Sequence, residues 1–146
     1  MSKLIKLIIK TDTDKATIII RFIVGYIFVT EGIQKFIYSD SLGVGRFIKI
    51  GILYPEIMAP FVGWCEIIFG AFLLVGFFVR VAFIPLIIIM FTAITTTKID
   101  LLLNEGIFYF SHEARNDLLM IFGLIFIFMK GAGANSFDRK INNANK

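Results

Sequence analysis

Four apolar stretches, separated by shorter polar segments, follow one another along the chain. A membrane-spanning α-helix needs about 20 consecutive, mostly apolar residues, and each stretch approaches or exceeds that length. The pattern therefore predicts an all-α integral membrane protein, a four-helix bundle that forms one domain over residues 1–146. The expected helices are residues 16–38, 55–78, 79–99 and 111–130, followed by a polar C-terminal tail of residues 131–146.

The connections between these stretches differ in length and composition. Residues 39–54 are rich in glycine and polar side chains, and residues 100–110 end in three aromatic residues that suit a membrane interface. Arg80 marks a short reversal between the second and third stretches, so we expect those two helices to pack as antiparallel neighbours. The tail, residues 131–146, is rich in asparagine and lysine and is expected to be loose.

Composition supports a lipid environment for this domain. The 146 residues are 58% hydrophobic and only 18% charged, and the mean hydropathy is +0.84. A water-soluble domain of this size would expose large apolar patches. The net charge of +4 does not indicate a nucleic-acid partner, because the basic residues sit at the ends of apolar runs and form no stripe. The lipid bilayer is the expected partner, and nucleic acid is not.

The distribution of lysine and arginine predicts the orientation of the helices, because cytoplasmic loops carry an excess of both. Nine of the 15 would lie on the side of the two termini and four on the other side, with Arg21 and Lys35 inside the first span. Both termini are therefore expected in the cytoplasm. The nine are Lys3, Lys6, Lys10, Lys15, Arg80, Lys130, Arg139, Lys140 and Lys146, and the four are Arg46, Lys49, Lys98 and Arg115.

Sulfur and imidazole groups are scarce. The chain has one cysteine, Cys65, and one histidine, His112. A single thiol forms no internal disulfide and no redox-active cysteine pair. One histidine and one cysteine do not make a zinc site, so no metal site is predicted.

Charged residues inside the predicted spans are the main candidates for chemistry, because a charge in a bilayer is costly and asks for a reason. Helical geometry places Arg21, Gly25, Gly32 and Lys35 on one face of the first helix. Gly63, Glu66 and Gly70 share a face of the second helix in the same way. Glycines allow helix backbones to approach closely in lipid, so these charged faces are expected to be contact faces.

The charged residues are expected to gather in a polar pocket that opens outward and closes near Glu66. Glu66 is the candidate catalytic proton carrier, because no partner lies one turn away on its own helix. Glu31 and Lys35 stand four residues apart and can pair with each other. A purely structural alternative stays open, in which buried ion pairs only fix helix register and Arg21 extends to the cytoplasmic headgroups. The candidate ligand-binding residues are Glu31, Lys35, Arg115 and Asp117.

Four segments resemble the DoxX family in the right order, over residues 21–138. They are RFIVGYIFVTEGIQKF, FVGWCEIIFGAFLLVGFFVR, IIIMFTAI and GLIFIFMKGAGANSFD. The first carries an arginine, a glycine four residues later and a closing Gly-x-x-Lys, and the last carries Gly-x-Gly followed by Ser-x-Asp. The positions that match the family pattern are Arg21, Gly25, Gly32, Lys35, Glu66, Arg80 and Asp138.

The resemblance implies a small, multi-pass, four-helix protein of the prokaryotic inner (plasma) membrane. The family takes its name from a subunit of an archaeal terminal quinol oxidase complex, and relatives are linked to redox homeostasis and to periplasmic redox enzymes. It implies a redox-linked subunit that associates with quinone or quinol and works with a membrane or periplasmic redox protein. Quinone is the cofactor that this reading implies. The chain is then at most one subunit of a quinone-linked oxidoreductase.

Two other functions fit the same residues. The chain could be a non-enzymatic membrane scaffold or assembly factor, in which case Glu66→Gln leaves the cellular phenotype intact while deletion does not. It could also carry a proton or a small solute with Glu66 as the gate, although four helices without an internal repeat favour this less unless the protein forms a homo-oligomer.

Overall fold

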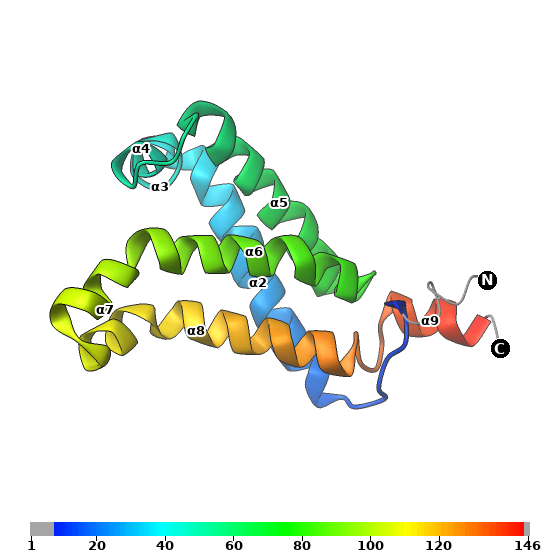
Figure 1. Ribbon diagram of the computed structural model, residues 1–146. Coiled ribbons are helices and arrows are strands. Elements are labelled where there is room, and N and C mark those ends of the chain that lie inside the picture. Colours follow the sequence, from blue (N-terminus) through cyan, green and yellow to red (C-terminus); the bar gives the residue numbers. More distant parts are fainter. Residues whose placement is uncertain (1–7, 145–146) are drawn as a thin grey trace.

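A computed structural model describes residues 8–144, and within that range all regular structure is α-helical (Figure 1). The fold is therefore all-α, as the hydrophobic pattern predicts. The helices are α2 (Ala16–Ile37), α3 (Ser39–Leu42), α4 (Val44–Lys49), α5 (Pro55–Val75), α6 (Val79–Thr97), α7 (Ile99–Glu105), α8 (Ile107–Lys130) and α9 (Phe137–Ala144).

Three helical stretches of the described residues are long and apolar enough to cross a membrane. They are α2, α5 and the stretch from α6 through α7, Val79–Glu105, with mean hydropathies of 1.7, 1.9 and 2.1. The fourth long helix, α8, has 24 residues but lacks an equally apolar stretch. Its N-terminal half carries Glu113, Arg115 and Asp117, which interrupt the apolar run.

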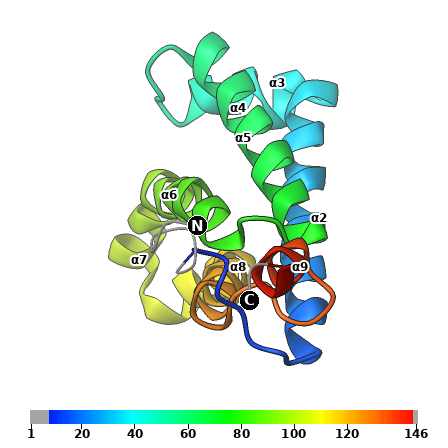
Figure 2. The same ribbon diagram turned by 90° about the vertical axis from the view of Figure 1, so that its right-hand side faces the viewer.

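The long helices form two pairs that cross. Figure 1 shows α2 beside α5, with α6 and α8 running side by side across them. Figure 2 views α6 and α8 nearly end-on next to the α2–α5 pair. At their short turn the chain reverses direction and α5 contacts α6, as expected, although the two helices diverge away from the turn. The other antiparallel neighbours are α2 with α5 and α6 with α8.

A small apolar core joins the two pairs on the side of α9. Phe28, Leu73, Leu86 and Leu124 come from α2, α5, α6 and α8 and are almost fully buried. Many large apolar side chains point away from this core; Phe122, for example, is 64% exposed. Such a surface is stable against lipid and would aggregate in water, so the fold agrees with a membrane location.

The connecting segments contain more helix than expected. Residues 39–54 hold α3 and α4, and residues 100–110 hold most of α7 and the start of α8. Gly106 separates α7 from α8, and its φ of 85° suits glycine. As a result α8 begins at Ile107, before the expected residue 111.

The C-terminal segment is ordered, so the expected loose tail of residues 131–146 is wrong for its described part. Gly131 and Gly133 adopt positive φ and turn the chain toward the start of α2, where Gly133 lies against Thr17. Ala132 and Ser136 are buried there, and α9 follows. The backbone N–H of Ala134 donates to the Asp14 carbonyl at 3.3 Å, which ties this segment to the chain before α2.

Candidate functional site

The α2–α5 contact is built on two pairs of glycines. A Cβ atom added to Gly32 would lie 2.6 Å from the carbonyl oxygen of Gly63, and one added to Gly25 would lie 2.9 Å from that of Gly70. These distances are too short for any side chain, so the two backbones touch. The prediction that the glycine faces of the first two spans are contact faces is confirmed.

A buried ion pair crosses this contact. Lys35 Nζ lies 2.6 Å from Glu66 Oε2, and their side chains are only 12% and 6% exposed. The Glu31 side chain is exposed. Lys35 Nζ reaches the backbone carbonyl of Glu31, at 3.5 Å, and not its carboxylate. The predicted pairing of Glu31 with Lys35 is therefore replaced by a pair between helices.

Further charges surround this pair at the end of the molecule away from α9. Glu66 interacts through space with Glu31 and with Arg46 of α4. Asp117 of α8 interacts with the same two residues and with Lys98. Glu31 and Arg46 thus interact with both carboxyl groups. We call Glu31, Lys35, Glu66 and Asp117, with Arg46 and Lys98, the outer charge cluster, where outer means the end of the molecule away from α9 and inner means the end that carries α9.

Arg115 differs from the other candidate ligand-binding residues. Its side chain is exposed and its Nη1 lies 3.1 Å from the imidazole nitrogens of His112, one turn away on α8. Lys98 pairs with Glu113 on α8 at 3.7 Å. Only the Lys98–Glu113 pair connects the C-terminal end of α6 to α8, and the contact of Arg115 stays within α8. Arg115 is therefore left outside the outer charge cluster.

Two aromatic residues lie close in sequence to the buried pair, one on each helix. Phe36 follows Lys35 in α2, and Trp64 precedes Glu66 by two residues in α5. Their ring centroids are 5.3 Å apart at an interplanar angle of 57°. Trp64 is 56% exposed and Phe36 is 41% exposed, so both rings present a face to the lipid side of the α2–α5 pair.

Arg21 lies in a second polar site at the opposite end of the bundle. It is 4% exposed, and its Nη1 donates to the Ala132 carbonyl at 2.6 Å. Gly76 packs so closely that an added Cβ would collide with the guanidinium. The interpretation that Arg21 extends to the headgroups is therefore wrong: the arginine holds the turned-back segment against α2 and the α5–α6 turn.

Asp138 joins the C-terminal segment to the start of α6. Its carboxylate oxygens accept hydrogen bonds from the backbone N–H groups of Phe78, at 2.7 Å, and Val79, at 3.3 Å. Its own N–H donates to the Gly76 carbonyl at 3.0 Å. Burial raises the pKa of Asp138, while those two hydrogen bonds and the charges of Arg80 and Arg21 oppose the rise.

This capping role was not predicted, because Asp138 lies far along the chain from the helix that it caps. The only signal in the sequence was that the Ser-x-Asp of residues 136–138 matches the family pattern. A side-chain oxygen that satisfies the first N–H groups of a helix normally comes from the residue just before that helix. Here Phe78 holds that position and has no such oxygen.

Arg80 makes a similar connection for the N-terminal segment. Its Nε donates to the Phe128 carbonyl at 3.0 Å, and its Nη1 donates to the carbonyls of Ile8, at 3.1 Å, and Lys10. Three of the family-pattern residues, Arg21, Arg80 and Asp138, thus connect both terminal segments to the inner ends of the long helices.

Metal and thiol chemistry gain no support from the described residues. Residues 8–144 contain no group of three or more histidine, cysteine, aspartate or glutamate side chains placed to hold a metal ion. Cys65 is a free thiol of intermediate burial in α5.

Comparison with known proteins places these features in a family. The DoxX family profile matches residues 16–99, which include both partners of the buried ion pair. An uncharacterized membrane protein of Mycobacterium tuberculosis is 41% identical over 141 residues, covering 92% of this chain and 86% of that protein. No solved structure matches the chain.

Proposed function

The chain belongs to the DoxX family of membrane proteins, and from this premise we propose that it is a quinone- or quinol-associated redox subunit that works with a partner oxidoreductase. We place it in the prokaryotic inner membrane as a multi-pass four-helix bundle. The site that we assign to the quinone is the Lys35–Glu66 pair with the rings of Phe36 and Trp64.

A four-span topology with both termini in the cytoplasm is part of this proposal. The 24 residues of α8 give a helix of about 36 Å, which is enough to cross a bilayer. Apart from Lys130 in its last turn, the charges of α8 lie in its N-terminal half, where Lys98 contacts Glu113 and His112 contacts Arg115. The start of α2, the α5–α6 turn and α9 lie at one end of the molecule in Figure 1, as an even number of crossings requires.

The observation that carries the quinone assignment is a Lys–Glu pair buried in an apolar helix contact beside two lipid-facing rings. A quinone reaches such a site from the membrane. Its ring can stack against Trp64 or Phe36, and its carbonyl oxygen can accept a hydrogen bond from Lys35.

Proton transfer is the role that we assign to Glu66. Oxidation of a quinol to a quinone releases two electrons and two protons. Glu66 accepts one proton, and the outer charge cluster provides a route for both to leave toward water. Both electrons pass to the redox centre of a partner protein, since one cysteine and one histidine give this chain no centre of its own.

The test is to purify the protein in native lipid and to measure co-purifying quinone by mass spectrometry. Wild type should carry quinone. The amount of quinone that co-purifies with Glu66→Gln should be at least about tenfold lower, because the carboxylate both holds Lys35 and accepts the proton. Glu56→Gln is the matched control, since Glu56 is an exposed residue of the same helix and lies outside the outer charge cluster. A wild type without extractable quinone and without a quinone-dependent rise in Tm would refute the proposal.

A scaffold or assembly factor is the second candidate, and one observation favours it. Lys35 and Glu66 satisfy each other, so the pair can fix the register of α2 on α5 without any ligand. This function predicts that cells carrying Glu66→Gln keep the wild-type phenotype and that pull-downs with Glu66→Gln retain the same partner proteins. The quinone-linked function predicts loss of the phenotype with the partner still bound.

A further inference from the structure

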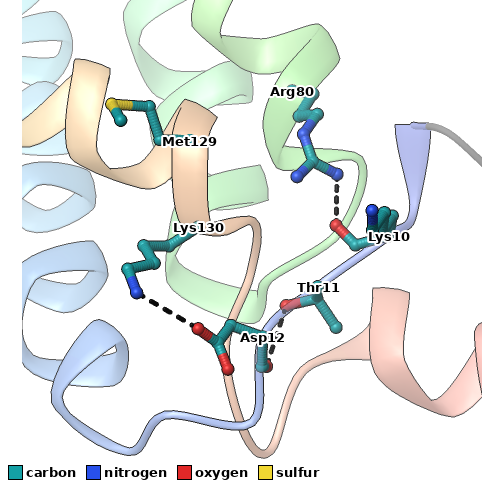
Figure 3. A pocket seen from close by; sticks show the side chains of 6 residues that line it. All are labelled: Lys10, Thr11, Asp12, Arg80, Met129 and Lys130. Atoms are coloured by element: carbon teal, nitrogen blue, oxygen red, sulfur yellow. Dashed lines mark hydrogen bonds and ion pairs between the residues drawn. The ribbon is translucent and has the colours of Figure 1, made fainter.

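A basic hollow lies at the inner end of the molecule, away from the Lys35–Glu66 site. It has a volume of about 420 Å³ and lies between the N-terminal segment, the first turn of α6 and the last turn of α8. Figure 3 shows Arg80 from α6 and Lys130 from α8 reaching the segment of residues 10–12. The lining residues are Lys10, Thr11, Asp12, Arg80, Met129 and Lys130.

The hollow carries an excess of positive charge. Lys10, Arg80 and Lys130 contribute three positive charges, and Asp12 contributes one negative charge. Asp12 accepts a hydrogen bond from the Thr13 N–H at 2.6 Å and pairs with Lys130 at 3.2 Å. These two interactions lower the pKa of Asp12, so it is ionised at neutral pH and the net charge of the hollow is +2.

Negative groups that would repel an anion here are already covered. The C-terminal carbonyls of a helix carry partial negative charge. In α8 the Phe128 carbonyl accepts a hydrogen bond from Arg80 Nε, and the Lys130 carbonyl accepts one from the Asp12 N–H at 2.9 Å. The same contacts fix the Arg80 guanidinium in place, so part of the binding site is organised before any ligand arrives.

An apolar surface adjoins the basic hollow. Met129, which lines it, is 74% exposed, and the neighbouring Phe128 is 42% exposed. The Phe128 ring stands 4.5 Å from the ring of Phe83 on α6. A positively charged hollow at the end of spanning helices, continuous with exposed apolar side chains, suits a ligand with an anionic head and an apolar tail.

We propose that this hollow binds the phosphate of an anionic phospholipid, with the acyl chains lying along Met129 and the Phe83–Phe128 pair. A second hollow of about 280 Å³, lined by Arg139 and Lys140 of α9, shares no lining residue with this one. A bound lipid would connect the N-terminal segment, α6 and α8 at the headgroup level. The proposal is independent of the quinone site.

The test compares the binding of phosphatidylglycerol with that of phosphatidylcholine, a lipid without net charge. Binding to the detergent-purified full chain is measured by native mass spectrometry and by the rise in Tm. Wild type should prefer phosphatidylglycerol. The double variant Lys10→Gln/Lys130→Gln should bind it roughly twentyfold more weakly, since each lysine near an anionic lipid contributes about fivefold. Asp12→Asn should bind about fivefold more tightly, which a purely structural role for these residues does not predict.

The matched control is Lys15→Gln/Lys140→Gln, which removes the same charge from the same end of the molecule but outside this hollow. It should lose less than threefold in affinity. The proposal is overturned if wild type binds the two lipids equally. It is also overturned if the control loses as much affinity for phosphatidylglycerol as Lys10→Gln/Lys130→Gln does. Equal protection by inorganic phosphate would assign the hollow to a free phosphate and would overturn the lipid assignment.

Discussion

The Lys35–Glu66 pair is the residue-scale feature with the largest predicted effect on stability. Removing one partner leaves a buried charge uncompensated, and such changes cost about 3–5 kcal/mol. We therefore expect Lys35→Met and Glu66→Leu each to lower the free energy of unfolding by that amount. The double variant should lie within about 1 kcal/mol of wild type, because a well-packed apolar pair can replace a buried ion pair.

Denaturant unfolding in detergent micelles measures all three variants in one double-mutant cycle. Glu31→Gln is the control, since Glu31 is exposed and touches Lys35 only through its backbone. Its effect should stay within about 0.5 kcal/mol. Additive losses in the double variant would mean that the two side chains stabilise the bundle through other contacts.

The Asp12–Lys130 pair should make the inner end of the molecule sensitive to acid. The Asp12 carboxylate accepts a hydrogen bond from the Thr13 N–H and pairs with Lys130, and these two interactions hold the pKa of Asp12 below the ordinary 3.8. A depressed pKa in the folded state stabilises the protein above the unfolded pKa, and this stabilisation is lost as pH falls through the folded value. The tether of residues 10–12 to α8 should therefore loosen below about pH 4.

Thermal unfolding between pH 3 and pH 7 checks this dependence. The difference in Tm between wild type and Asp12→Asn should be constant above about pH 5 and should shrink as the pH falls below about 4. A difference that grows on acidification would contradict the assigned sign.

Sequence reasoning at this scale identified the buried faces but not the partners. The 100° repeat of a helix placed Lys35 and Glu66 on contact faces. It left Lys35 a choice between Glu31 on its own helix and Glu66 across the contact, and only the register of α2 on α5 decides that choice. Arg21 was assigned wrongly for a related reason: its partner Ala132 comes from a segment that no local pattern connects to α2.

The α2–α5 crossing depends on glycine at the scale of whole helices. A methyl group at Gly32 would meet the backbone oxygen of Gly63, which cannot move aside without separating the helices. We expect Gly32→Ala to lower the free energy of unfolding by about 1–3 kcal/mol, despite the better helix propensity of alanine. It should also weaken the Lys35–Glu66 contact three residues later.

Gly123→Ala in α8 is the matched control for this prediction. Its Cβ would meet a methyl group of Val24, a side chain and not a backbone atom, so a small shift relieves the contact. Chemical denaturation should show the smaller loss for this variant. Equal losses would mean that the α2–α5 crossing has room to adjust.

Elements outside the four long helices were the least predictable. The helices α7 and α9 are too short to be identified as spans. Sequence reasoning therefore assigned α7 to a connection and α9 to the C-terminal tail. The order of α9 comes from tertiary contacts, chiefly those of Asp138 with Phe78 and Gly76. Helices of this length owe their stability to packing more than to propensity.

At the scale of the whole molecule, the polar residues form two separate groups at opposite ends of the bundle. The inner group, with Arg21, Arg80 and Asp138, joins the terminal segments to the helix ends. The outer charge cluster contains the close Lys35–Glu66 ion pair and lies toward the end of the molecule away from α9. The inner group thus connects the terminal segments to the long helices, and the outer charge cluster contains the pair to which we assign the quinone.

The proposed topology follows from this arrangement and can be measured directly. In a Cys65→Ala background, which removes the single native cysteine, we introduce Ser41→Cys in α3, Asn104→Cys in α7 or Asn143→Cys in α9, all at exposed positions. A membrane-impermeant maleimide on intact cells should label the first two. Because four crossings place α9 in the cytoplasm, Asn143→Cys should react only after permeabilisation.

The decisive position is Asn143, because α8 is the helix whose crossing the composition of the chain leaves open. If α8 lay on the outer surface, α9 would be outside with α7, and Asn143→Cys would be labelled on intact cells. Labelling of Ser41→Cys only after permeabilisation would instead invert the whole orientation. That result would place the excess of lysine and arginine outside, against the rule that basic residues stay in the cytoplasm.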